Sequence, residues 1–129
     1  MKLTKSTVIG GFALLLFASA VSTRAGDNCD VEAGALAATK CVACHALDTP
    51  DNRVGPSLHG VYGRKIAGYE GFGYSRALRK LEGVWTEEDL DKFLLKPQAY
   101  ARGTSMAFGG LQKDQERSDL ICFLKQQGD

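Results

Sequence analysis

The sequence predicts an all-α domain in which short helices alternate with long loops. Apolar residues recur at helical spacing in four segments, and residues typical of helix termini bound them. No convincing alternation of apolar and polar residues predicts a strand. Residues 46–73, rich in glycine with two prolines, and residues 98–111 predict loops. Such long loops in a small domain suggest that they cover something, so we expect a large apolar ligand to complete the core.

Two short helices are expected in the first half of the domain. The first runs from Asp30 to Lys40, and its acidic start and basic end complement a helix dipole. The second runs from Arg76 to Leu81, where Ser75 can cap its start and Gly83 lies beyond its end. Both segments are flanked by loop residues rather than by strands.

Two longer helices are expected in the second half. Thr86 and Asp89 form a variant of the capping box, with Asp in place of Glu, and Pro97 ends the helix that they open. The last helix runs from Asp114 to Gln127 and is followed by Gly128. The apolar residues that define the faces of these two helices are Leu90, Phe93, Leu94, Leu120, Ile121 and Leu124.

The first 25 residues differ from the rest and predict a secretory signal peptide. Lys2 and Lys5 give a positive start, an apolar run follows, and small residues offer cleavage after Ala20 or, preferably, after Ala25. The apolar run is shorter than the roughly 20 residues that span a bilayer, so we expect no stable membrane insertion after cleavage. The remaining domain, residues 26–129, is expected in the periplasm, where cysteines are usually oxidised.

Charge excludes one class of partner. Cleavage leaves 13 of the 16 basic residues against 15 acidic residues, a formal charge of −2. Nucleic-acid-binding domains are usually strongly basic, and this chain has no run of lysine and arginine. We therefore expect no nucleic-acid partner. The domain has no internal repeat or linker, and we expect a monomer.

The segment KCVACH contains the side chains with the most specific chemistry: Cys41, Cys44 and His45. A zinc site needs a further close pair of ligands, and the remaining cysteines and histidine are scattered. A redox dithiol of the thioredoxin kind needs a βαβ context. A Cys41–Cys44 disulfide is possible in an exported chain but leaves the histidine unexplained. Cys-x-x-Cys-His is the attachment pattern of c-type haem.

This spacing suits one covalently bound haem. Two thiols three residues apart can add to the vinyl groups on one porphyrin edge, and the histidine that follows can bind the iron. Met106 is the one methionine left after cleavage and lies in a glycine-bounded loop, so it is the candidate second axial ligand. With both axial positions filled, the iron is suited to electron transfer rather than catalysis.

Several motifs beyond KCVACH make residues 28–128 resemble class I cytochrome c, closest to its mitochondrial and bacterial branch. These motifs are VGPSLHGVYGRK, GYSRAL, VWTEEDL, KPQAYARGTSMAF and ERSDLICFLK. The resemblance implies helices and long loops wrapped around one haem. It also implies that the first and last helices cross near Gly34, Leu120 and Phe123.

The resemblance implies roles for further residues. The Pro56 carbonyl would accept the N–H of His45. The haem propionates would be held by four residues, Arg64, Tyr74, Trp85 and Thr104.

Three departures from relatives stand out. Phe93 replaces a tyrosine that contacts the methionine sulfur in many relatives, and Leu78 replaces a polar residue beneath the haem. Ala37 and Ala38 stand where relatives have a bulky aromatic residue. The more apolar surroundings would favour ferrous iron and raise the reduction potential, while lost packing would soften the fold.

Two cysteines are left outside the motif. Cys29 precedes the first helix and Cys122 lies in the last, beside the expected crossing. In an oxidising compartment they most simply pair as a disulfide, with two free thiols as the alternative.

The sequence thus predicts a periplasmic one-electron carrier that passes electrons between a donor and an oxidase, reductase or reaction centre. Redox protein partners would dock at the exposed haem edge, around which we expect Lys40, Arg53, Arg102 and Lys113. Two alternatives stay open. One is a haem enzyme or gas sensor with a displaceable Met106, and the other is a cytochrome subunit bound permanently to a dehydrogenase.

Overall fold

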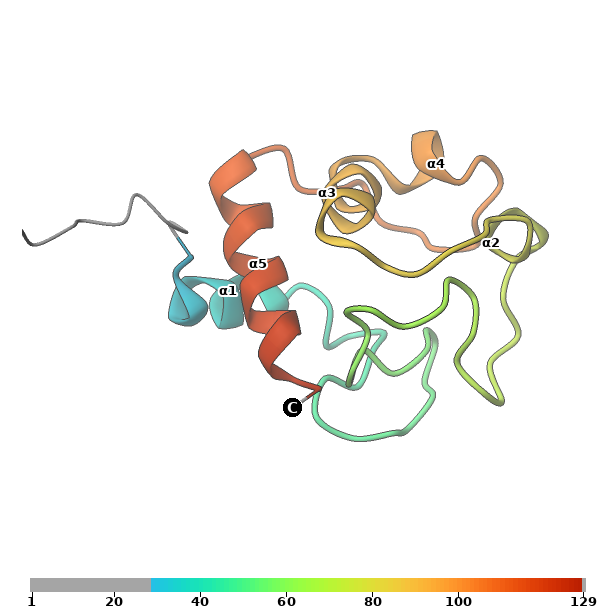
Figure 1. The fold of residues 1–129 in the computed structure, drawn as a ribbon, viewed down its shortest axis with the longest axis horizontal. Coiled ribbons are helices and arrows are strands. Elements are labelled where there is room, and N and C mark those ends of the chain that lie inside the picture. The colour runs from blue at the N-terminus through green and yellow to red at the C-terminus, as the bar shows by residue number, and fades with distance from the viewer. Residues whose placement is uncertain (1–28, 129) are drawn as a thin grey trace, which may run out of the picture.

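The computed structural model describes residues 29–128, so the expected signal peptide and its cleavage sites lie outside the described residues. Helices and long loops make up this part of the chain, in agreement with the predicted all-α class (Figure 1). The helices are α1 Val31–Ala38, α2 Arg76–Arg79, α3 Glu87–Leu95, α4 Pro97–Tyr100 and α5 Asp114–Gln126. Within residues 29–128, no helix is long and apolar enough to cross a bilayer.

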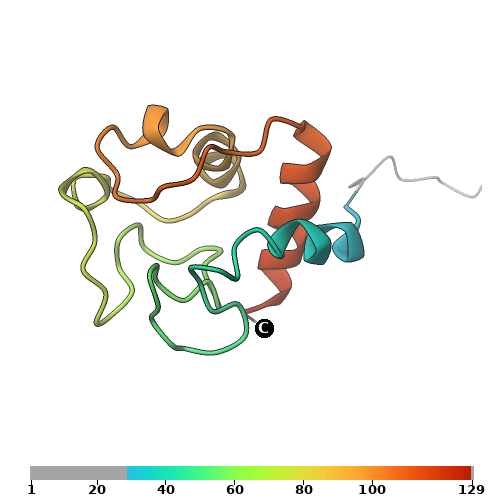
Figure 2. The same ribbon diagram turned by 180° about the vertical axis from the view of Figure 1, so that it is seen from behind.

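The helices α1 and α5 cross at one end of the molecule, as expected (Figures 1 and 2). Gly34 makes the close approach possible, because a Cβ atom there would lie 2.7 Å from the carbonyl carbon of Asp119 and 2.8 Å from Cβ of Phe123. The backbone N–H of Asp30 donates to the Asp119 carboxylate at 3.0 Å. The start of α1 is thereby fixed to the middle of α5.

Cys29 and Cys122 meet at the same end. Their Cα atoms are 5.9 Å apart, within the usual range for bonded cysteines, and the structure joins their sulfur atoms. Cys41 and Cys44 are the unpaired cysteines of the described residues.

The predicted helix starts are confirmed by their caps. The Asp30 side chain accepts the N–H of Ala33, and Ser75 accepts that of Leu78. Thr86 accepts the N–H of Asp89. The helix ends are less well predicted, since α1 stops at Ala38, α2 at Arg79 and α5 at Gln126.

The loop predicted over residues 98–111 is wrong in its first residues. Pro97 ends α3 but also begins α4, where it occupies the first helical position. Proline suits that position because its fixed φ matches a helix and its missing N–H would have no partner there. The single turn of α4 changes which side chains face the loop that follows.

A short antiparallel contact closes the base of the long loop. Trp85 N–H donates to the Arg64 carbonyl at 2.9 Å, and Gly63 N–H donates to the Trp85 carbonyl at 2.9 Å. A single bridge, between Lys65 and Val84, is all that this pairing forms. The bridge was not predicted, because one residue on each side is too short a stretch to show the alternation of apolar and polar residues that indicates a strand. It places Arg64 beside Trp85.

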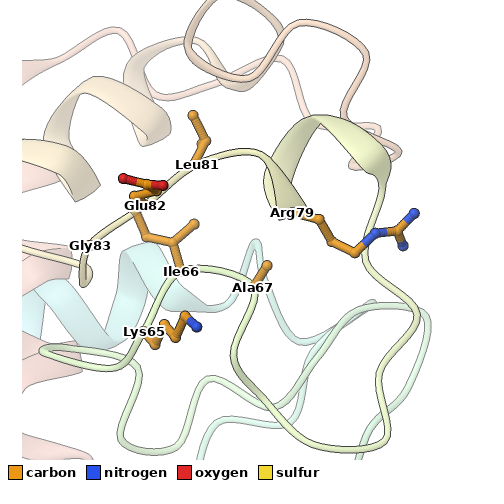
Figure 3. A pocket seen from close by; sticks show the side chains of 7 residues that line it. All are labelled: Lys65, Ile66, Ala67, Arg79, Leu81, Glu82 and Gly83. Atoms are coloured by element: carbon orange, nitrogen blue, oxygen red, sulfur yellow. The ribbon is translucent and has the colours of Figure 1, made fainter.

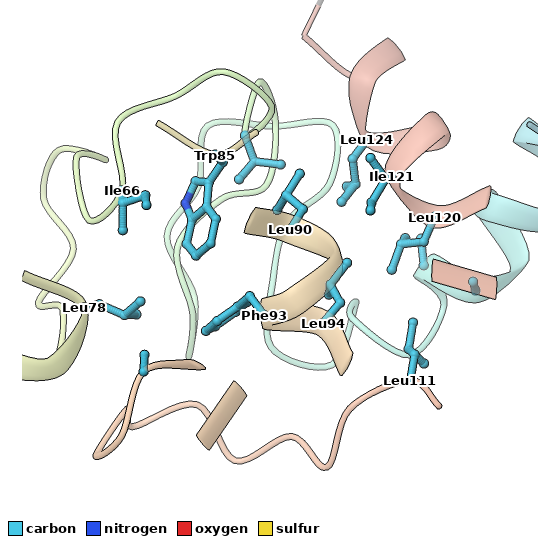
Figure 4. Close-up of a cluster of buried hydrophobic side chains, with 14 residues drawn as sticks. Ile66, Leu78, Trp85, Leu90, Phe93, Leu94, Leu111, Leu120, Ile121 and Leu124 are labelled. Atoms are coloured by element: carbon cyan, nitrogen blue, oxygen red, sulfur yellow. The ribbon is translucent and has the colours of Figure 1, made fainter. Parts of the chain in front are cut away.

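The buried core is one hydrophobic cluster, in which two regions can be distinguished (Figure 4). In the first, leucines of α3 face α5. In the second, four side chains from separate segments point toward one another: Ile66 from the long loop, Leu78 from α2, Trp85 from the segment before α3, and Phe93 from α3. These side chains form an apolar cluster, which we call the loop-side cluster.

Candidate functional site

A tight turn after α1 presents the two unpaired cysteines and the histidine. Cys41 N–H donates to the Ala38 carbonyl at 2.9 Å, which continues the helical winding beyond α1. The Cys41 carbonyl then accepts N–H groups from Cys44 at 3.0 Å and His45 at 2.9 Å. The motif is therefore held as one compact turn, in which His45 is buried and Cys44 is exposed.

The imidazole of His45 is oriented by the loop that follows. Its Nδ1 lies 2.6 Å from the carbonyl oxygen of Pro56, as expected from the resemblance. A carbonyl can only accept, so Nδ1 carries the hydrogen and Nε2 keeps a lone pair for a metal ion. Burial chiefly lowers the pKa of His45, and Arg64 lowers it further, while the Pro56 hydrogen bond opposes both. The ring is therefore favoured in its neutral, metal-binding form.

Gly55 is a site residue that the sequence analysis missed. A Cβ atom at this position would lie 2.7 Å from Nδ1 and 2.8 Å from Nε2 of His45, so the backbone packs against the ring. The Gly55 N–H also donates to the Cys44 carbonyl at 2.8 Å, which joins the loop to the cysteine turn. The only sequence signal was its position directly before Pro56.

Arg64 shows one group without a partner. Its Nη2 donates to the Ser57 carbonyl at 2.8 Å and its Nη1 to the His59 carbonyl at 3.2 Å. Its Nε is buried and has no acceptor among the described residues. Buried N–H groups are rarely left unpaired, so this one points to an acceptor supplied by a ligand. Burial lowers the pKa of Arg64, and a carboxylate beside Nε would oppose that effect.

Three further residues are expected to hold the haem propionates: Tyr74, Trp85 and Thr104. Tyr69 connects Arg64 to Tyr74: the Arg64 guanidinium lies 4.4 Å from the Tyr69 ring, and Tyr69 N–H donates to the Tyr74 hydroxyl at 3.3 Å. This leaves the Tyr74 hydroxyl hydrogen to donate to another acceptor. Trp85 is buried with its ring 5.0 Å from that of Phe93. Thr104 is buried in the segment that leads to Met106.

Met106 packs against the same apolar core. It is half-buried, and its backbone N–H lies 3.3 Å from the Thr104 hydroxyl oxygen. Phe93 and Leu78, the two apolar departures noted in the sequence, are both buried in that core. Neither can offer a hydrogen bond to a methionine sulfur.

These residues fit a covalently bound haem. Two unpaired thiols directly precede an oriented histidine, and a buried arginine N–H lacks an acceptor among the described residues. Met106 packs against the apolar core that includes the loop-side cluster. No group of three His, Cys, Asp or Glu residues within 29–128 is arranged to hold a metal ion by itself. The donor set thus suits iron in a porphyrin better than a bare ion.

A surface depression beside Ile66 of the loop-side cluster is lined by none of the cysteine, histidine, methionine or carboxylate-binding residues expected at the site (Figure 3). Its charged groups are Lys65, Arg79 and Glu82. The Arg79 guanidinium points away from the other two and donates to the Tyr74 carbonyl. The depression therefore offers no convergent set of charges.

Comparison with known proteins finds similar chains among cytochromes c. A cytochrome c homolog of Bradyrhizobium diazoefficiens is 47% identical over 100 residues, which are 76% of this chain and 54% of that protein. This chain thus spans about half the length of that relative. Cytochrome c of Stellaria longipes is 46% identical over 99 residues, 74% of this chain and 91% of its own length.

A solved structure is similar as well. Cytochrome cH from Methylobacterium extorquens matches with a TM-score of 0.71 at 38% identity, over 75% of this chain and 98% of its own. No protein-family model matches the chain.

Proposed function

Since the chain belongs to the class I cytochrome c family, we propose that it is a periplasmic monohaem electron carrier. Cys41 and Cys44 would attach the haem, and His45 and Met106 would bind its iron. The haem supplies a centre that gains and loses one electron. The observation that carries the proposal is the buried His45 beside two unpaired cysteines, with Nδ1 tied to Pro56 and Nε2 left to bind.

The remaining residues bind and orient. Pro56 fixes the tautomer and direction of the His45 ring, and Gly55 leaves room for it. The propionates are held by Arg64, Tyr74, Trp85 and Thr104. Arg64 gives this role its best support, since its buried Nε has no hydrogen-bond acceptor among the described residues.

The carrier role follows from the ligand set. With His45 and Met106 both bound to the iron, a substrate would have no free position, so the protein would act as an electron-transfer partner rather than an enzyme. Its partners are redox proteins, and we expect neither nucleic acid nor a second copy of the chain. Of the expected haem-edge cations, Lys40 pairs with Glu116, while Arg53 reaches the Val42 carbonyl at 3.4 Å.

Export and the disulfide form the second part of the proposal. The signal peptide over residues 1–25 delivers the domain to the periplasm, where Cys29 and Cys122 oxidise to a disulfide. The short distance between their Cα atoms supports this pairing. Alkylation of the unreduced, haem-loaded protein followed by mass spectrometry should find no reactive thiol. Two alkylated thiols at Cys29 and Cys122 would remove the disulfide from the proposal.

Visible spectra of the haem-loaded protein test the ligands. The oxidised form should show the far-red band of thioether-bound ferric iron, and the reduced form should bind carbon monoxide only weakly, because carbon monoxide has to displace Met106. Met106→Ala should lose the band and bind carbon monoxide. The double variant Cys41→Ser and Cys44→Ser should release its haem under denaturing conditions, whereas the parent protein should retain it.

A gas-binding or sensor function is the second candidate. Phe93 is buried in the core near the methionine segment and offers no hydroxyl to support the sulfur. If the wild-type protein lacks the far-red band and takes up carbon monoxide readily, this candidate replaces the carrier.

A further inference from the structure

Gln98 lies on α4, the helical turn that the sequence analysis missed, and its side chain bridges to the segment that carries Met106. Its Nε2 donates to the Thr104 carbonyl at 2.8 Å and approaches the Met106 carbonyl at 3.4 Å. One amide therefore contacts the backbone on both sides of Ser105. No role for this residue is implied by the ligand set described above.

The Met106 segment has few other attachments. Thr104 N–H donates to the Ala101 carbonyl at 2.9 Å, and Met106 N–H donates to the Thr104 hydroxyl at 3.3 Å. Among the described residues, the next backbone hydrogen bond along the chain is that of Leu111, whose N–H donates to the Leu94 carbonyl at 2.8 Å. The Gln98 amide is thus a large part of what holds the Met106 backbone.

The α4 turn that carries Gln98 is itself well anchored. Pro97 is fully buried, and its carbonyl accepts the N–H of Ala101 at 2.9 Å. The Tyr100 hydroxyl donates to the Asp89 carboxylate on α3 at 2.8 Å, and the Tyr100 ring lies 5.8 Å from that of Phe93. Gln98 therefore donates from a well-anchored helical turn to a segment that has few other hydrogen bonds.

We propose that Gln98 is a positioning residue that holds the Met106 segment so that the thioether stays on the iron. The proposal rests on the proposed His45 and Met106 ligation and deepens it. Gln98 touches neither ligand atom and acts through the backbone of Thr104 and Met106. Its amide supplies N–H donors without adding charge near the site.

Two substitutions distinguish the effect of the hydrogen bond that the Gln98 amide donates from the effect of the size of its side chain. Gln98→Glu keeps the size and shape but replaces the amide donor with a carboxylate, which only accepts. Gln98→Ala removes the group altogether. Gln112→Glu is the matched control, because Gln112 is also exposed and donates through Nε2 to a carbonyl, that of Leu95 at 3.2 Å. Within the described residues, no hydrogen bond joins the Gln112 side chain to the Met106 segment.

The test measures carbon monoxide affinity of the reduced, haem-loaded protein together with the far-red band of the oxidised form. Carbon monoxide must displace the thioether, so its affinity reports how firmly Met106 is held. Loss of one hydrogen bond of ordinary strength should raise that affinity about five- to tenfold in Gln98→Glu and Gln98→Ala. The band should also disappear at a lower temperature in both. Gln112→Glu should stay within about twofold of wild type.

Each outcome decides one point. If both Gln98 variants match Gln112→Glu in carbon monoxide affinity and band, Gln98 has no positioning role, even if their unfolding temperatures fall. If the wild-type protein itself lacks the band, Met106 is not a ligand, and the carrier proposal and this inference end together.

Discussion

The two sides of the candidate site are held in different ways. On the His45 side, which comprises α1, the cysteine turn and the loop to Ser57, backbone hydrogen bonds and steric contact at Gly55 fix the ring. On the Met106 side, which comprises α3, α4 and residues 101–111, side chains hold the segment. His45 is 8% exposed, whereas Met106 is only half-buried.

The difference indicates a division of roles between the two proposed ligands, His45 and Met106. A ring packed against backbone, directly after the two proposed attachment cysteines, cannot leave without disrupting the fold. A thioether on a segment held by a few side-chain contacts can respond to changes in those contacts. Variation in reduction potential and ligand exchange should therefore arise on the Met106 side, and variation in global stability on the His45 side.

Opening the α1–α5 end should have the largest effect, because α1 leads directly into the cysteine turn. Cys29→Ser with Cys122→Ser removes a closed loop with a sequence separation of 93 residues, and should lower the free energy of unfolding by about 4 kcal/mol in the chain-entropy model. Denaturant unfolding of the haem-loaded protein measures this.

The far-red band of this double variant should persist until the protein unfolds, since the two cysteines lie at the α1–α5 end and the Met106 segment is held by Gln98 and Thr104. Loss of the band well before unfolding would show that the two sides are not separable. An unchanged unfolding midpoint would show that the pair adds no stability.

A methyl group at Gly55 should have the next largest effect. Gly55→Ala places a Cβ atom against the His45 ring, and overpacking of this kind should cost about 2–3 kcal/mol and disturb the axial bond. Gly73→Ala is the control, because a Cβ atom there has no neighbour within 4 Å. Thermal unfolding and the ferric spectrum should change in the first variant and hardly in the second. Equal behaviour of the two would show that the ring is not packed as tightly as the structure indicates.

The sequence predicted the residues whose chemistry is unusual and missed those that act by shape. Cys41, Cys44, His45 and Met106 could be named because few other residues in the chain can bind haem iron or its vinyl groups. The ring contact at Gly55 could not be predicted, because a glycine before a proline is equally typical of an ordinary turn. Only the folded backbone shows what a Cβ atom there would meet.

The helices show the same limit. The starts at Ser75 and Thr86 were predicted because a cap is a local hydrogen bond between near neighbours in sequence. The start near Asp30 was predicted from its acidic residues, which complement the helix dipole. The α4 turn was missed because a proline that ends one helix can also begin the next. The sequence does not show that Pro97 is buried in a position that starts a new turn. The role of Gln98 depends on that turn and could not be predicted either.

The smallest effect concerns pH on the Met106 side, where Tyr100 ties α4 to α3. Burial and then the hydrogen bond to Asp89 raise the pKa of Tyr100 to about 12, above its ordinary value of 10.0. A raised pKa means that the folded protein favours the neutral phenol. The stability that this tie contributes is therefore complete below about pH 10 and disappears as pH rises through about 12.

Tyr100→Phe removes the hydroxyl and should lower the free energy of unfolding by about 1 kcal/mol at neutral pH, since one hydrogen bond is lost. The difference from wild type should stay constant to about pH 10 and shrink toward pH 12. Asp89→Asn should bring the phenol titration, followed by ultraviolet absorbance, only part of the way back to its ordinary value, because burial is the larger cause. A full return would make the carboxylate the main cause. A constant difference between wild type and Tyr100→Phe through pH 12 would mean that the α3–α4 tie does not depend on this proton.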